Sequence, residues 1–138
     1  PYFEREGMKA CFAGHSALET FGALQRPESD GRTLGVLFGS RRGELKRMGP
    51  VLRDAAARIM AAQPKMRIIS PTLPHLADTV RDLLRDLPAQ VVSDPAVKLN
   101  AFASMDYAIA TSGTVGLELA IVGVPHVIAY RVNRLTYE

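Results

Sequence analysis

The sequence predicts an α/β fold, in which helices cover both faces of a parallel β-sheet. Short apolar runs alternate with segments of helical spacing, which is typical of repeated β–α–β units. Glycine, proline and capping residues stand at the boundaries between these segments. The apolar runs are expected to be buried strands at residues 8–13, 33–38, 66–69, 89–92, 107–110 and 127–130.

Helices are expected between these strands. The apolar residues at helical spacing are Leu45, Met48, Leu52, Ala55 and Ile59, followed by Leu76, Val80, Leu83, Leu84 and Leu87. Gly49 and Pro50 interrupt the first pattern, so we expect there either a short turn of helix before them or a kink. A shorter apolar helix is expected near residues 17–24.

Capping residues mark two further helix ends. Asp94 precedes Pro95, which predicts a helix start because aspartate caps free N–H groups and proline fits the first turn. Gly123 and Pro125 are expected to end the last helix.

The chain of 138 residues is long enough for one domain. Residues 1–24 are interpreted as an interdomain connection with the first strand and helix, residues 25–32 as an exposed loop, and residues 33–138 as the domain. Cys11 lies in an apolar run and is expected to be buried. No helical pattern follows the last strand, so we expect a domain truncated at its C-terminal end and a natural protein that continues.

Composition argues against several classes of function. The net charge is +3, but no aromatic residues interleave with the basic stretch and tryptophan is absent, which disfavours nucleic-acid binding. One cysteine and three separated histidines predict neither a disulfide nor a metal site. Neither a membrane-spanning run of roughly 20 apolar residues nor a signal peptide is recognisable, which predicts a cytoplasmic chain.

Basic residues gather in one segment of the chain. Those interpreted as candidate contacts for phosphate or acidic lipid are Arg41, Arg42, Lys46 and Arg47. Arg53 and Arg58 are expected on a solvated helix face instead.

Two strand-to-helix junctions carry the candidate chemistry, because ligands bind open parallel sheets beyond the carboxyl ends of the strands. In the first junction, Gly39 permits close backbone approach, Ser40 can cap the helix or bond an oxygen, and Arg41 offers a planar fork to a phosphate. A capped turn without a ligand is the structural alternative. We favour phosphate binding.

In the second junction, small residues at 110–116 expose backbone N–H groups at the start of a helix, an arrangement suited to a diphosphate without a metal. Glu118 lies about one turn further and could accept hydrogen bonds from both hydroxyls of a ribose, although a surface glutamate near the helix start is the alternative. Neither the Walker A loop nor the dinucleotide fingerprint is present. His15 could touch a substrate or fill an interdomain corner.

Together these motifs resemble the lipid-A-disaccharide synthase family. The resemblance rests on Ala13-Gly14-His15, on Gly39-Ser40-Arg41-Arg42 with Glu44, on Ala110-Thr111-Ser112-Gly113-Thr114 with Leu117-Glu118-Leu119-Ala120, and on Gly123-Val124-Pro125 through Tyr130-Arg131. Their order and spacing match over almost the whole chain. Ser16 and Glu19 depart from the proline and aspartate that are usual in the family, and Phe38 replaces a usual proline.

The resemblance implies the GT-B arrangement, in which two Rossmann-like domains face a cleft. Residues 33–138 then form the C-terminal domain, which binds the UDP-sugar donor. The implied donor-site residues are Gly39, Ser40 and Arg41 near the diphosphate, Ser112, Gly113 and Thr114 cradling it, Glu118 on the ribose, and His15 near the hinge and the sugar.

The implied reaction is an inverting transfer of a diacylglucosamine from UDP-2,3-diacylglucosamine to 2,3-diacylglucosamine 1-phosphate, a step of bacterial lipid A and lipopolysaccharide biosynthesis. No metal or cofactor is implied. The general base is expected in the other domain, so this chain alone is expected to be inactive. The acylated substrates imply a full-length hexosyltransferase that is peripheral at the inner face of the inner membrane.

Two other functions stay open. One is a different UDP-sugar transferase or epimerase of the same architecture, and the other is a non-catalytic nucleotide- or anion-binding module. UDP binding would not separate the two enzymes, whereas activity on an acylated substrate would.

Overall fold

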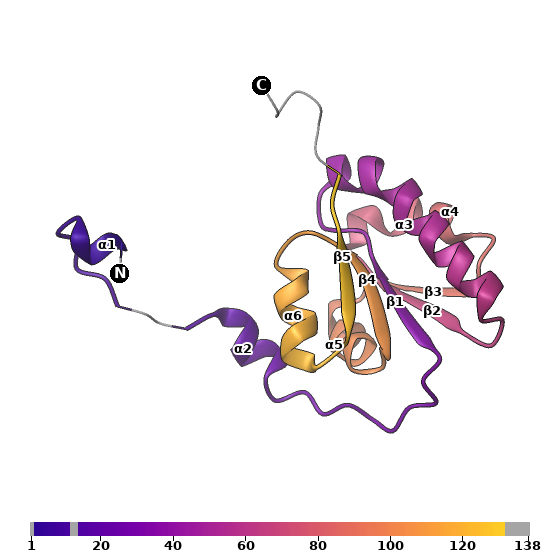
Figure 1. Ribbon diagram of the computed structural model, residues 1–138, viewed down its shortest axis with the longest axis horizontal. Coiled ribbons are helices and arrows are strands. Elements are labelled where there is room, and N and C mark those ends of the chain that lie inside the picture. The colour runs from indigo at the N-terminus through magenta and orange to yellow at the C-terminus, as the bar shows by residue number, and fades with distance from the viewer. Residues whose placement is uncertain (1, 12–13, 132–138) are drawn as a thin grey trace.

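The computed structural model describes residues 2–11 and 14–131, and its centre is a five-stranded parallel sheet (Figure 1). The strands are β1 (Thr33–Leu37), β2 (Arg67–Pro71), β3 (Ala89–Val92), β4 (Tyr107–Thr111) and β5 (His126–Ala129). Their order in the sheet is β3-β2-β1-β4-β5, so the chain leaves the centre in one direction and returns to continue in the other. The predicted parallel α/β fold is confirmed.

Helices cover both faces of the sheet, as predicted (Figure 1). The helical elements are α1 (Tyr2–Arg5), α2 (Ser16–Phe21), α3 (Arg42–Ala62), η1 (Pro74–Leu76), α4 (Ala77–Leu84), α5 (Pro95–Ala103) and α6 (Val115–Val122). Helices α3 and α4 pack on one face, whereas α2, α5 and α6 pack on the other.

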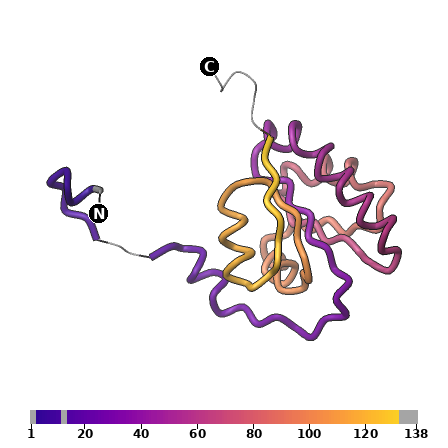
Figure 2. The backbone as a smooth tube through the Cα atoms, viewed as in Figure 1, coloured from indigo at the N-terminus to yellow at the C-terminus, as the bar shows by residue number. Residues whose placement is uncertain are grey.

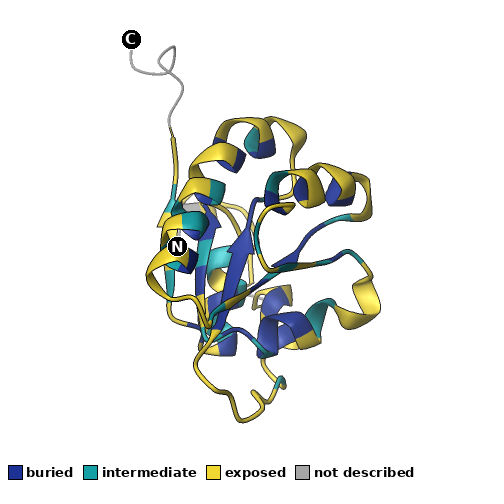
Figure 3. Ribbon diagram, turned by 90° about the vertical axis from the view of Figure 1, so that its right-hand side faces the viewer, coloured by how far each residue is buried: buried dark blue, intermediate teal, exposed yellow. Residues whose placement is uncertain are grey.

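Two hydrophobic cores result, one on each face, and the central strand β1 between them is buried over its whole length (Figure 3). The first core joins Leu52 of α3 and Val80 of α4 to Val36 of β1. The second joins Phe102 of α5 and Leu119 of α6. Burying each such side chain stabilises the fold by about 1.5–3 kcal/mol, so the two layers hold the sheet in place.

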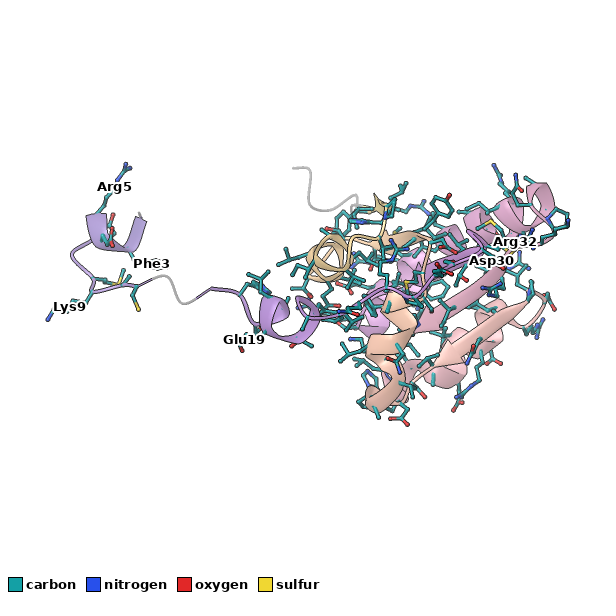
Figure 4. All side chains as sticks on the ribbon, turned by 90° about the horizontal axis from the view of Figure 1, so that it is seen from below. Phe3, Arg5, Lys9, Glu19, Asp30 and Arg32 are labelled. Atoms are coloured by element: carbon teal, nitrogen blue, oxygen red, sulfur yellow. The ribbon has the colours of Figure 1, made fainter. Side chains whose placement is uncertain are left out.

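The strand expected at residues 8–13 is wrong for the part that the structure describes. Residues 8–11 are exposed and belong to no strand, and residues 12–13 lie outside the described residues. Figures 2 and 4 show this segment, with Phe3, Arg5 and Lys9, apart from the sheet. Cys11 is exposed rather than buried, because none of the described strands and helices covers this run.

Helix α3 passes through the interruption expected at Gly49 and Pro50 and has Pro50 inside it. The same face of the helix is buried before and after the proline, as Leu45 and Leu52 show. Packing of this continuous apolar face therefore outweighs the backbone hydrogen bond that proline removes.

The other boundary residues act as expected. The backbone N–H of Ala96 donates to Asp94 Oδ1 at 2.9 Å at the start of α5, and Gly123 ends α6 with φ of +75°. Residues 25–32 are exposed and form neither helix nor strand. Within the described residues, no helix combines the length and apolar character that are needed to cross a bilayer.

Candidate functional site

A cavity of about 290 Å³ opens where the carboxyl ends of β1, β2 and β4 meet, and we call it the carboxyl-end cavity. Because β1 lies between β2 and β4, the loops that follow these three strands are neighbours. The predicted site residues that line it are Gly39, Ser40, Arg41, Ser112, Gly113, Thr114 and Glu118. Two segments that are far apart in sequence, residues 39–41 and 112–118, thus form walls of one cavity.

Gly39 makes the sharp turn from β1 into α3. Its φ is +89°, in the left-handed region that side chains other than glycine rarely adopt. A Cβ atom at this position would lie 2.6 Å from Glu44 Oε2 and 2.9 Å from Thr111 Oγ1. Glycine is therefore required for both the conformation and the close approach of β1 to β4.

Arg41 stands at the cavity rim as the N-cap residue of α3. Its side chain is 82% exposed, and its Nη1 lies 3.6 Å from Glu44 Oε1. Ser40 is exposed, and Arg41 rather than Ser40 is the N-cap residue of α3. The capping role considered for Ser40 is therefore wrong. An exposed guanidinium beside a loosely held carboxylate remains able to bind an anion.

Helix α6 starts at the opposite wall, with Thr114 as its N-cap residue. The Thr114 side chain forms no capping hydrogen bond, so the first N–H groups of α6 rely on other partners. These donors and the positive end of the helix dipole favour an anion here. Glu118 follows in the first turn of α6 and is partly buried in the cavity wall.

Two polar residues of this cavity, Thr72 and Lys98, were not singled out from the sequence, and Thr111 was named only as part of the second junction. The hydroxyls of Thr72 and Thr111 are buried, and no hydrogen-bond partner for them lies in the part of the chain that the structure describes. Thr72 directly follows β2, so its position after an apolar run was the available signal. The sequence alone does not show that β2 lies next to β1 in the sheet, so it could not place Thr72 beside the other residues of the cavity.

His15 lies outside the carboxyl-end cavity. It lines a second cavity of about 400 Å³ between α2 and α5, which we call the α2 cavity, and its Nδ1 accepts a hydrogen bond from Ala17 N at 3.1 Å. This bond caps α2. The two cavities share Lys98, Thr114 and Glu118, so His15 stands across a shared wall from the other predicted residues.

The basic segment divides in the structure. Arg41 lines the carboxyl-end cavity, whereas Arg42, Lys46 and Arg47 are exposed on α3 outside it. Arg53 pairs with Asp54 at 3.3 Å and with Asp86 at 3.6 Å, which fits the solvated helix face expected for it. Among the residues described, no cluster of three or more histidine, cysteine, aspartate or glutamate side chains could hold a metal ion.

A larger hollow, about 980 Å³, lies at the other end of the sheet, between the end of α3 and strands β4 and β5. Its walls include Ile59, Ile109 and Val127, and Val127 is 65% exposed. None of the predicted site residues lines it. Its size reflects an uncovered apolar sheet face rather than converging polar groups, so we place the candidate site at the carboxyl ends.

Comparison with known sequences connects this site to a family. A family model described as lipid-A-disaccharide synthetase matches residues 1–138. A protein of Ruegeria pomeroyi named lipid-A-disaccharide synthase is 39% identical over 161 residues, which cover 99% of this chain and 39% of the relative. One of Rhodospirillum centenum with the same name is 34% identical and covers 99% and 37%. The chain thus spans about two fifths of the length of these relatives.

Solved structures share the fold at low sequence identity. A complex of Staphylococcus aureus MnaA with UDP superimposes with a TM-score of 0.63 at 13% identity, covering 92% of this chain and 38% of that one. The UDP-GlcNAc 2-epimerase of Neisseria meningitidis, bound to UDP-GlcNAc, gives 0.55 at 14% identity, covering 82% and 31%. The likeness concerns the arrangement of strands and helices.

Proposed function

Because the chain belongs to the lipid-A-disaccharide synthetase family, we propose that it is the UDP-sugar-binding half of an inverting glycosyltransferase of lipid A biosynthesis. One observation carries this proposal. The carboxyl-end cavity gathers seven residues that the family resemblance assigns to the donor, from two distant segments of the chain. Residues 33–138 then act as the donor domain of a two-domain GT-B enzyme.

The diphosphate of the donor would lie between the two junctions of the cavity. Arg41 supplies a forked cation from one wall, and the backbone around Ser112, Gly113 and Thr114 supplies N–H donors at the start of α6 from the other. Glu118 accepts hydrogen bonds from the ribose hydroxyls. His15, which lines the α2 cavity across the shared wall, would lie towards the sugar.

The chemistry proposed for the full protein moves a diacylglucosamine from its UDP derivative to the hydroxyl of diacylglucosamine 1-phosphate, with inversion at the anomeric carbon. The bond between this carbon and the diphosphate oxygen breaks as the acceptor oxygen attacks. Negative charge grows on the departing UDP, and Arg41 with the α6 N-terminus stabilises it. The acceptor and the general base belong to the part of the enzyme that faces this domain.

The carboxyl-end cavity is small for an acylated sugar, which supports placing only the nucleotide and diphosphate inside it. The acyl chains would lie outside, close to a membrane. We place the full enzyme at the cytoplasmic face of the inner membrane, where the exposed Arg42, Lys46 and Arg47 can meet acidic lipid. If the protein sedimented equally with neutral and with anionic vesicles, this contact with acidic lipid would be ruled out.

A titration of the chain with UDP tests the donor site directly, with ADP and inorganic phosphate as comparison ligands. We expect selective amide shifts at residues 39–41, at 112–114 and at Glu118. The variant Glu118→Gln should lose about tenfold in affinity for UDP, because an amide accepts fewer hydrogen bonds from the ribose. Glu19→Gln on α2 outside both cavities removes the same charge and should bind as wild type.

Equal responses to UDP, ADP and phosphate would instead indicate a non-catalytic anion-binding module. The alternative enzyme activity acts on a UDP-sugar without acyl chains, and it is considered because the fold is shared with UDP-GlcNAc 2-epimerases. Assay of the full-length protein on UDP-GlcNAc and on UDP-diacylglucosamine separates the two enzymes. Turnover of UDP-GlcNAc alone would overturn the lipid A assignment.

A further inference from the structure

Lys98 of α5 stands at the junction of the carboxyl-end cavity and the α2 cavity. It lines both of them, together with Thr114 and Glu118 of the α6 start. These three residues therefore form the wall that the two cavities share.

The ammonium group of Lys98 has no anionic partner in the described part of the chain. Its nitrogen forms no ion pair within 4.0 Å with any described carboxylate, although Glu118 lines the same two cavities. Arg41 differs, because Glu44 lies 3.6 Å away and offsets part of its charge. Lys98 is therefore the less neutralised of the two cations that line the carboxyl-end cavity.

The side chain of Lys98 is held in place by packing. Its nitrogen lies 5.6 Å from the centre of the Phe102 ring, and Phe102 is completely buried. A cation over an aromatic face is attracted to it, and the aliphatic stem is partly covered. This contact places the ammonium group beside Phe102, which also lines the carboxyl-end cavity.

The electrical surroundings of this ammonium group are unfavourable without an anion. Thr114 and Glu118, which share the two cavity walls with Lys98, belong to the first turn of α6, where the helix carries its positive partial charge. Glu118 is the acidic residue of this turn, but it forms no ion pair with Lys98 within 4.0 Å. A cation close to a helix start is disfavoured unless negative charge compensates both, so this arrangement favours a bound anion.

We propose that Lys98 binds the diphosphate of the UDP-sugar donor, opposite Arg41, at the point where the donor passes from the carboxyl-end cavity towards the α2 cavity. This assignment rests on the proposed function and adds a residue that the sequence motifs do not mark. The diphosphate then lies between two cations and the start of α6. Of the two, Lys98 is the more shielded from water, since its stem packs on Phe102.

The test compares Lys98→Gln with Arg58→Gln, which removes one positive charge from the exposed face of α3 outside both cavities. Affinities for uridine, UMP and UDP are measured by calorimetry on each variant. For Lys98→Gln we expect unchanged uridine binding, a modest loss for UMP and a loss of about tenfold for UDP. Arg58→Gln should bind all three ligands as wild type does, and Lys98→Arg should recover most of the UDP affinity.

Each outcome separates this inference from the proposed function. Wild-type protein that does not select UDP would sink the proposed function and this assignment with it. If the wild type selects UDP but Lys98→Gln binds UDP equally well, only the role of Lys98 is overturned. A parallel loss for uridine and UDP, with a lower melting temperature, would show that Lys98 supports the fold and not the phosphate.

Discussion

The two ends of the sheet are built differently. At the amino ends, polar groups pair within the chain: Thr33 N donates to Asp106 Oδ2 at 2.9 Å, and Arg26 donates to the carbonyls of Met105 and Gly123 at 2.5 and 2.9 Å. At the carboxyl ends, the hydroxyls of Thr72 and Thr111 are buried without a partner among the described residues. The bonds at the amino ends therefore hold the fold together, whereas the unpartnered hydroxyls at the carboxyl ends fit the ligand contacts that we propose there.

The largest effect is expected at the carboxyl ends from Gly39→Ala. The new Cβ meets Glu44 and Thr111 in a backbone conformation that alanine disfavours, so the free energy of unfolding should fall by about 1–3 kcal/mol. UDP binding should be lost as the turn shifts. Urea unfolding and calorimetry measure the two effects.

Gly43→Ala is the matched control, because a Cβ atom there has no neighbour within 4 Å and lies in the first turn of α3. It should leave UDP binding intact and stabilise the helix by up to about 1 kcal/mol. Wild-type affinity in Gly39→Ala would contradict the role of this turn.

The next effect concerns the amino ends alone. Arg26→Ala removes two hydrogen bonds from a charged group that is 32% exposed, so we expect a loss of about 1–2 kcal/mol in the free energy of unfolding. UDP affinity should not change, since Arg26 lies away from the carboxyl-end cavity. If fully folded Arg26→Ala bound UDP more weakly than wild type, the amino and carboxyl ends of the sheet would be coupled.

A pair of hydroxyl deletions should have opposite effects. Ser70 Oγ donates to Val36 O at 2.7 Å, so Ser70→Ala should destabilise the protein by about 1 kcal/mol. Thr111→Val removes an unpartnered buried hydroxyl and should raise the melting temperature of the ligand-free protein while weakening UDP binding. If Thr111→Val destabilises as Ser70→Ala does, the idea of reserved ligand contacts at this end is wrong.

The smallest effect is the acid dependence of the pair between Asp30 and Arg67 at the start of β2. Its N–O distances are 3.0 and 3.2 Å, and the hydrogen bond from Arg67 lowers the pKa of Asp30 below its ordinary value of 3.8. The stabilisation is thus present above that value and is lost as the pH falls through the lowered pKa. Both groups are exposed, so the effect should be small.

Thermal unfolding of wild type and Asp30→Asn, from pH 7 to pH 3, checks this dependence. The difference between their melting temperatures should shrink as the pH falls. A difference that stays constant over this range would mean that Asp30 acts through something other than its charge.

Most of the sheet could be predicted from the sequence, because buried parallel strands and capped helices have local signatures. Asp94 and Gly123 mark helix ends by their own chemistry, and the strands around them follow as apolar runs. The run at 8–13 has the same local signature. It forms no strand over 8–11 because no neighbouring strand of the described chain pairs with it, and pairing is a non-local property.

The candidate site follows the same division. Gly39, Arg41 and Glu118 could be singled out because each sits at a junction with a recognisable type of sequence. Lys98 could not, since nothing local to α5 indicates that its side chain reaches a cavity made by other elements. The order of the strands in the sheet decides which elements meet at this cavity, and the sequence does not reveal that order.

The central place of β1 also has a consequence for folding kinetics. The bond from Ser70 to Val36 spans 34 positions, whereas the bond from Thr33 to Asp106 spans 73. Since each doubling of a closed loop costs about 0.6 kcal/mol of chain entropy, β1 with β2 should form before β4 joins. The carboxyl-end cavity needs both neighbours of β1, so nucleotide binding should emerge last during refolding, after most helical signal has returned.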